Sequence, residues 1–182
     1  MNDWVQRKPL RLQGYNYSKA GYYFVTICTA LRGENILAEI LPGSPTVGAA
    51  ALGGPSPIPD RGPSDNLDIV LTPAGRIVKQ YIENIDHVYN GCAGIDCYTI
   101  MPDHIHMVVW IRTLEDGPPR AAAPTVTLPG IVNAMKGLSS KKLGYPIWQR
   151  SYYEHIIRGR EDLQSIRQYI QNNPLKWVLG KE

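Results

Sequence analysis

The stretch IMPDHIHMVVWI, residues 100–111, contains two histidines inside an apolar run with the composition of a buried β-strand. Side chains on a strand alternate between its faces, so His104 and His106 point the same way while Ile105 points the other way. The Pro-Asp pair before them is typical of a tight turn, which predicts that the strand begins at the histidines. Two imidazoles on one sheet face could bind a metal ion, and a structural role in the core is the alternative.

The rest of the chain supplies strands and helices around this turn. Pattern and composition predict strands over residues 21–30, 67–72, 95–101, 104–112 and 147–158. They predict helices over residues 72–89, 127–143 and 161–174, the first with Thr72 as N-cap and the last ended by Pro174. This order predicts an α+β fold, a ferredoxin-like split βαβ sandwich with an antiparallel sheet and helices on one face.

Length and composition limit the class of protein. The 182 residues predict a single domain, 1–182, with flexible insertions at about 41–66 and 113–124, which are rich in Pro, Gly and small residues. No apolar run approaches the roughly 20 residues of a membrane-spanning helix, and the N-terminus lacks the apolar core of a signal peptide. We therefore expect a cytoplasmic protein without membrane contact. The three cysteines lack paired spacing, which argues against a disulfide framework and a structural zinc site.

The net charge of +3 is distributed unevenly, and local basic clusters indicate a polyanionic partner. The candidate phosphate contacts are Arg7, Lys8, Arg11, Lys136, Lys141, Lys142, Arg158 and Arg160. Tyr15 and Tyr17 are the candidates for stacking on DNA bases. A solvated basic face is the alternative for each cluster.

Several motifs occur in an order that resembles a known family. They are RLQGYNYSKAGYYFVTICT (11–29), MPDHIHMVVW (101–110), WQRSYYEHIIR (148–158) and QYIQNNPLKW (168–177). Together they resemble the landmarks of HUH single-strand DNA transposases with one catalytic tyrosine, specifically the REP-associated tyrosine transposases. The resemblance implies a ferredoxin-like core and a divalent metal ion, Mg²⁺ or Mn²⁺, bound by His104 and His106. It also implies a tyrosine on a helix that cleaves single-stranded DNA.

Tyr169 is the candidate catalytic tyrosine among the eleven tyrosines of the chain. Tyr169 and Asn173 are four residues apart, so they share one face of the predicted last helix. The family often has Gln as a metal ligand at the second position, which makes the shorter Asn173 the candidate third ligand. Asn172 is the weaker candidate because it lies about 100° around the helix. The rival nucleophiles are Tyr152 and Tyr153, on a predicted strand.

Three further residues have more than one interpretation. His155 could be a metal ligand, an acid or base, a phosphate contact or a structural residue. Asp103 is expected to be a turn residue, and His87 is expected to interact with the C-terminus of its helix.

The resemblance implies a metal-dependent single-stranded DNA transposase or nickase. Such an enzyme cleaves and rejoins DNA next to hairpins through a 5′-phosphotyrosine intermediate. One alternative is a noncatalytic ferredoxin-like nucleic-acid-binding module, and another is a nickase of the replication-initiator or relaxase type. The expected partner is single-stranded or hairpin DNA, and the expected assembly is a monomer or a homodimer.

Overall fold

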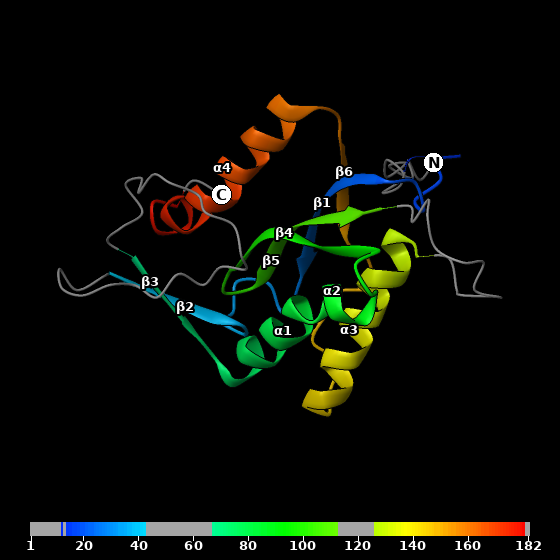
Figure 1. The fold of residues 1–182 in the computed structure, drawn as a ribbon. Helices are drawn as coiled ribbons and strands as arrows, with labels where there is room; N and C mark the ends of the chain where they lie inside the picture. Colours follow the sequence, from blue (N-terminus) through cyan, green and yellow to red (C-terminus); the bar gives the residue numbers. More distant parts are fainter. Residues whose placement is uncertain (1–11, 13, 43–66, 113–125, 181–182) are drawn as a thin grey trace, which may run out of the picture.

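The computed structural model describes residues 12, 14–42, 67–112 and 126–180. Its main sheet contains four antiparallel strands in the order β4–β5–β1–β6 (Figure 1). These strands are β4 (Ala93–Ile100), β5 (His104–Ile111), β1 (Gly21–Cys28) and β6 (Tyr153–Ile157). The predicted strands that flank the Pro-Asp turn are therefore confirmed as β4 and β5.

The connections between these strands form two crossovers. β1 and β4 run parallel with β5 between them, and α1 (Pro73–Glu83) lies in the connection. β5 and β6 run parallel with β1 between them, and α3 (Leu128–Leu143) lies in that connection. This topology confirms the α+β class, the antiparallel sheet and the split βαβ arrangement.

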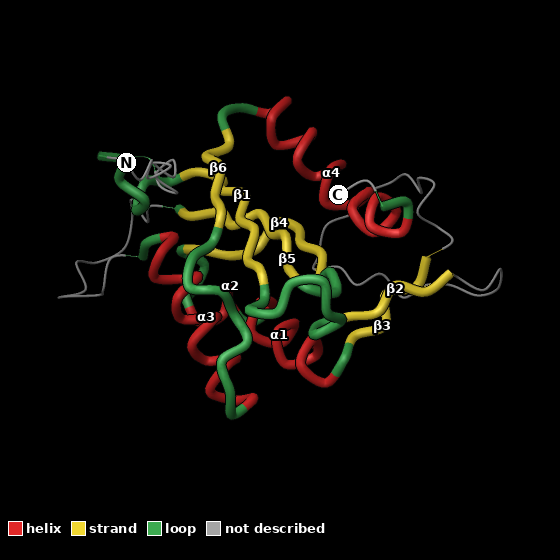
Figure 2. The backbone as a smooth tube through the Cα atoms, turned by 180° about the vertical axis from the view of Figure 1, so that it is seen from behind, coloured by secondary structure: helices red, strands yellow, loops and turns green. Residues whose placement is uncertain are grey.

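The helices lie on both faces of the sheet (Figure 2). α1, α2 (Ile85–Val88) and α3 cover one face, where Val78, Ile85 and Ile131 belong to the main core. α4 (Arg160–Val178) covers the other face, where Ile170 packs with Phe24 and Val108. The expectation that helices lie on one face therefore holds for α1, α2 and α3 but not for α4. None of the helices in the described ranges is long and apolar enough to span a membrane.

A separate two-stranded ribbon precedes α1. It pairs β2 (Ala38–Pro42) with β3 (Leu67–Leu71). The sequence predicts β3 but not β2, which is short, ends in proline and shows no clear alternation, so its pairing with β3 defines it. The predicted insertions at 41–66 and 113–124 lie almost entirely outside the described residues.

Pro174 does not end the last helix, contrary to the prediction. α4 continues through it to Val178, four residues further. A proline inside a helix removes one backbone hydrogen bond and crowds the preceding turn. Pro174 is buried, and the apolar packing of its ring offsets part of the local cost. As a result Lys176 and Trp177 also lie on α4, beyond the boundary that the sequence predicts.

The start of α1 is pressed against the backbone that enters β2. Thr72 caps the helix as predicted, because its Oγ1 accepts a hydrogen bond from the Gly75 N–H at 3.0 Å. The same hydroxyl donates to the Ile36 carbonyl at 2.7 Å. A Cβ atom at Gly75 would lie 1.9 Å from the Leu37 carbonyl oxygen, so only glycine fits at this contact.

We expect Gly75→Ala to lower the free energy of unfolding by about 1–3 kcal/mol, because the methyl group would displace backbone. The matched control is Gly137→Ala on α3, where an added Cβ meets nothing within 4 Å. That control should raise the free energy of unfolding by about 0.5–1 kcal/mol, since alanine favours a helix over glycine. Urea denaturation of both variants gives the comparison, and equal changes would contradict this account of the close approach.

Candidate active site

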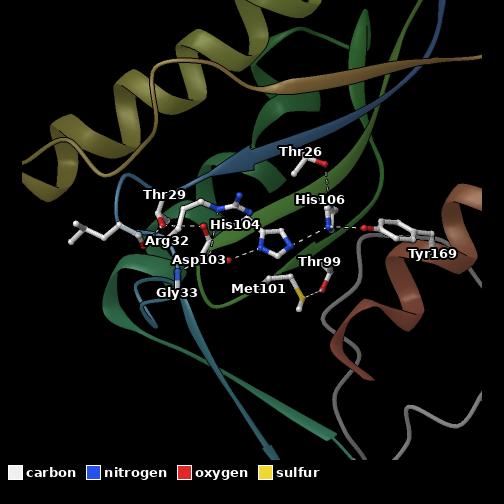
Figure 3. A network of polar contacts seen from close by, with 11 residues as sticks. Thr26, Thr29, Arg32, Gly33, Thr99, Met101, Asp103, His104, His106 and Tyr169 are labelled. Atoms are coloured by element: carbon white, nitrogen blue, oxygen red, sulfur yellow. Dashed lines mark hydrogen bonds and ion pairs between the residues drawn. The ribbon is translucent and has the colours of Figure 1, made fainter. Parts of the chain in front are cut away.

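The two histidines stand side by side at the start of β5. Antiparallel pairing with β1 sets His106 opposite Thr26 and His104 opposite Cys28. Both histidines are buried, on the face that α4 covers. Their Nε2 atoms are 3.1 Å apart (Figure 3). The structure therefore brings the predicted pair of nitrogens together.

Asp103 orients the first histidine. Its Oδ1 lies 2.6 Å from His104 Nδ1, and its Oδ2 accepts a hydrogen bond from the Gly33 N–H at 2.8 Å. Burial opposes ionisation of this carboxyl group, but the hydrogen bonds with His104 and Gly33 outweigh it and lower the pKa of Asp103. An ionised Asp103 can only accept, so His104 Nδ1 donates to it, and this hydrogen bond orients the ring with Nε2 toward His106.

His106 is held as a neutral imidazole. Burial, with a further contribution from nearby His104, lowers the pKa of His106 to about 3. Its Nδ1 lies 2.8 Å from Thr26 Oγ1, a hydroxyl that can donate or accept. If Thr26 accepts, the Nε2 lone pair of His106 faces His104 Nε2 across 3.1 Å, where it can accept a hydrogen bond or bind a cation.

Tyr169 reaches the same place from α4. Its hydroxyl lies 3.5 Å from His106 Nε2, and its ring packs edge-on against His106 and Phe24. The Lys176 ammonium lies 4.6 Å from the centroid of the same ring. The side chain is 36% exposed, so the phenol borders both the buried histidines and solvent. The predicted nucleophile and the predicted metal ligands thus meet in space.

Asn173 contributes a buried amide one helical turn after Tyr169. The residue is 0% exposed, and neither Oδ1 nor Nδ2 has a hydrogen-bond partner among the described residues. A buried polar group without a partner costs about 1–3 kcal/mol. Native structures contain few such groups, and each one points to a missing partner such as an ion or water.

The residues present fit a divalent metal ion. Two ligands of one ion at about 2.1 Å and at a right angle lie about 3 Å apart, which matches the separation of the two Nε2 atoms. Asn173 Oδ1 is an oxygen donor that lacks a partner within the described residues. The described ranges contain no group of three or more His, Cys, Asp or Glu side chains able to bind a metal, so the amide of Asn173 is the candidate third protein ligand among these residues.

Tyr152 and Tyr153, the rival candidate nucleophiles, lie in environments that differ from that of Tyr169. Tyr152 is buried in the main core, on the sheet face away from α4. Tyr153 lies opposite Thr26 on β6 but is 57% exposed. His155 pairs with Asp162 at 3.0 Å on the surface, away from the histidine pair. Of these tyrosines, Tyr169 is the one whose contact with His106 the structure records.

Two of the predicted DNA contacts are wrong in this structure. Lys136 is buried, and its ammonium donates to the Gln149 and Arg150 carbonyls at 2.8 and 3.2 Å, so it stabilises the loop before β6. Tyr17 is buried, and its hydroxyl accepts from the Leu12 N–H at 3.1 Å. Both side chains are buried and have polar atoms bonded inside the protein, so the structure does not support them as DNA contacts.

The other predicted DNA contacts differ in accessibility. Tyr15 is half-buried and packs edge-on against Tyr17, which leaves only part of its ring for stacking. The exposed candidates are Lys141, Lys142, Arg158 and Arg160. Arg7, Lys8 and Arg11 lie outside the described residues. Asn172 is half-buried on α4, and His87 is exposed in the last turn of α2.

Sequence reasoning missed two residues that orient the histidines. Asp103 was expected to be only a turn residue, although its place directly before His104 signals a possible contact. Thr26 is 80 residues from His106 in the chain, and only the register of β1 on β5 shows that it faces the imidazole. Trp177 also lies near the pair, with its ring 5.9 Å from that of His104.

Known proteins resemble this chain over different lengths. No family model matches it. An uncharacterized protein of Haemophilus influenzae is 32% identical over 189 residues, which cover 94% of this chain and 89% of the relative. A second Haemophilus influenzae protein, described as "Putative REP-associated tyrosine transposase", is 33% identical over 82 residues, which cover 42% of this chain and 47% of the relative.

A solved structure shares the fold. It is described as the REP-associated tyrosine transposase bound to a REP hairpin, and it matches with a TM-score of 0.56 and 18% sequence identity. The match covers 89% of this chain and 71% of that chain. This chain therefore shares its fold with that transposase, and part of its sequence is similar to the second Haemophilus influenzae protein.

Proposed function

We propose that this protein cleaves and rejoins single-stranded DNA next to hairpins, in a metal-dependent reaction that passes through a 5′-phosphotyrosine intermediate. The observation that carries the proposal is the approach of the Tyr169 hydroxyl to His106 Nε2, at 3.5 Å, beside a second imidazole. The unpartnered amide of Asn173 on the same helix supports it. These groups combine a candidate nucleophile, Tyr169, with candidate ligands for a metal ion.

The chain's own residues divide the chemistry between them. His104, His106 and Asn173 would hold Mg²⁺ or Mn²⁺, which would neutralise charge on the nonbridging oxygens and the leaving 3′ oxygen. Asp103 and Thr26 orient the imidazoles through their Nδ1 atoms. Phe24 packs against the ring of Tyr169 and fixes its position beside His106.

Tyr169 is the proposed nucleophile. Its oxygen attacks the phosphorus, a new O–P bond forms and the bond to the 3′ oxygen breaks. The phenol loses its proton and the leaving oxygen gains one, so the products are a 5′-phosphotyrosyl ester and a free 3′-OH. The ester keeps the energy of the broken bond, so another 3′-OH can attack it and rejoin strands without ATP.

The proposed DNA partner is a single strand that carries a hairpin. The solved structure of similar fold is described as bound to a REP hairpin, and this chain exposes Lys141, Lys142, Arg158 and Arg160. A noncatalytic binding module would bind the same DNA without a covalent product, which makes the covalent adduct the decisive observation.

The prediction of metal binding is tested with two double variants, each of which removes two histidines. The double variant His104→Ala/His106→Ala should bind Mn²⁺ at least about 100-fold more weakly, because both nitrogen ligands are lost. The matched control, His87→Ala/His155→Ala, removes two exposed histidines outside the site and should keep the wild-type affinity. Isothermal titration calorimetry measures both, and equal Mn²⁺ affinity in the two double variants would refute the assignment.

Asp103 should act through His104. Asp103→Ala removes the acceptor for His104 Nδ1, and we expect Mn²⁺ affinity to fall about 10–100-fold. Asp103→Asn keeps one oxygen that can accept from His104 Nδ1 and loses the acceptor for the Gly33 N–H, so it should lose less than Asp103→Ala. Asp162→Ala, which removes the carboxylate paired with exposed His155, is the control and should lose nothing. A loss in Asp103→Asn as large as in Asp103→Ala would show that charge, not orientation, matters.

Tyr169→Phe removes the nucleophilic oxygen and keeps the ring, so hairpin binding should persist while the covalent adduct disappears. Tyr153→Phe is the matched control and should keep the adduct, because that exposed tyrosine lies on β6. The measurement is a denaturing gel of protein mixed with a labelled hairpin oligonucleotide and Mn²⁺ or Mg²⁺. An adduct that survives Tyr169→Phe would move the nucleophile elsewhere, and its loss in Tyr152→Phe or Tyr153→Phe would assign the nucleophile to that tyrosine instead.

A further inference from the structure

We propose that the ion pair between Asp96 and Arg167 is a clamp that sets the position of the Tyr169 hydroxyl relative to His106. Asp96 lies in β4 of the main sheet, and Arg167 lies on α4, two residues before Tyr169. Neither residue touches the histidines, so both are positioning residues. The inference rests on the proposed nucleophilic role of Tyr169.

An irregularity in β4 turns Asp96 toward α4. Ile95 pairs with Val109 and Cys97 pairs with Val108, so Asp96 is an extra residue in the ladder, as in a β-bulge. Ile95 packs against the main core and Cys97 against the small core under α4. A bulge re-aims a side chain that regular alternation would place elsewhere. Here two consecutive residues, Asp96 and Cys97, contact the α4 side of the sheet.

The contact between the two side chains is bidentate. Arg167 Nε donates to Asp96 Oδ2 at 2.8 Å, and Arg167 Nη2 donates to Asp96 Oδ1. The Asp96 side chain is 11% exposed and the Arg167 side chain 32%, so solvent screens the pair only in part. A fork of this kind fixes distance and orientation together, which a single charge on a flexible stem does not.

The apolar cluster that packs α4 against the sheet is small by comparison with the main core. Its buried residues are Phe24, Val108 and Ile170, whereas α1 and α3 share a much larger cluster with the other face. Ile170 follows Arg167 by three residues and lies on the same side of the helix. With few fully buried apolar side chains under α4, a directional polar contact can contribute to the register of the helix on the sheet.

The position of α4 along the sheet matters because the distance from the Tyr169 hydroxyl to His106 Nε2 is at the upper limit for a hydrogen bond. The hydroxyl lies 3.5 Å from His106 Nε2, and α4 rises about 1.5 Å per residue. A displacement of about 1 Å at a reacting group can cost on the order of 100-fold in rate. Arg167 lies two residues, or about 200°, around α4 from Tyr169. The ion pair can therefore fix the helix without entering the site.

The test compares Arg167→Lys with Arg76→Lys. The first variant keeps the charge and loses the fork, whereas the second makes the same change at an exposed arginine of α1. In Arg167→Lys we expect the single-turnover rate of adduct formation at saturating hairpin to fall about 10–100-fold. Hairpin affinity and Mn²⁺ affinity should match wild type, and Arg76→Lys should match it throughout. A lower melting temperature with an unchanged rate would overturn the clamp and leave a merely stabilising ion pair.

A second readout does not depend on DNA cleavage. The Tyr169 ring lies 5.2 Å from the His106 ring, so its ring current shifts the His106 proton signals in an NMR spectrum. The Tyr169→Leu variant gives the position of the His106 signal without the tyrosine ring current. The signal that is lost in the His106→Gln variant is assigned to His106. The clamp predicts that Arg167→Lys and Asp96→Asn both move the His106 signal toward the Tyr169→Leu value. An unmoved signal in both variants would refute it. If the wild type forms no adduct, the proposed function fails, and the NMR result still decides the clamp.

Discussion

The antiparallel pairing of β5 with β1 is the interaction on which the candidate site depends. Its register sets Thr26 beside His106 and brings both histidines onto the face that α4 covers. A shift of one residue would send both imidazoles into the main core, because neighbouring side chains on a strand point to opposite faces. Ile105 and Met107, which alternate with the histidines along β5, oppose such a shift because it would move them from the main core to the histidine face.

The two faces of the sheet have different roles. One face packs against α1, α2 and α3 and contains most of the buried apolar residues. The other bears the histidines and supports α4 on a small apolar contact and the Asp96–Arg167 pair. The proposed nucleophile, Tyr169, therefore lies on a helix whose buried apolar contact with the sheet is smaller than that of the helices on the other face.

The site also contains groups that reduce stability unless a ligand is present. Asn173 Oδ1 and Nδ2 have no hydrogen-bond partner among the described residues, and they lie on the helix that covers the histidine pair. Proteins usually satisfy buried polar groups, so unsatisfied ones concentrate where a ligand binds. The same residues bear the proposed metal chemistry, and this coincidence connects the cost in stability to the proposed function.

The sequence by itself determined the local features, because strand alternation, helix caps and turn residues act over a few positions. It predicted β4, β5, the shared face of His104 and His106, the Thr72 cap and the shared face of Tyr169 and Asn173. Tertiary structure decided which distant residues meet: Thr26 beside His106, Asp96 beside Arg167, and Lys136 turned inward to backbone carbonyls. It also decided that β2 pairs with β3 and that α4 continues beyond Pro174. These outcomes depend on packing between segments far apart in the chain, which no local pattern encodes.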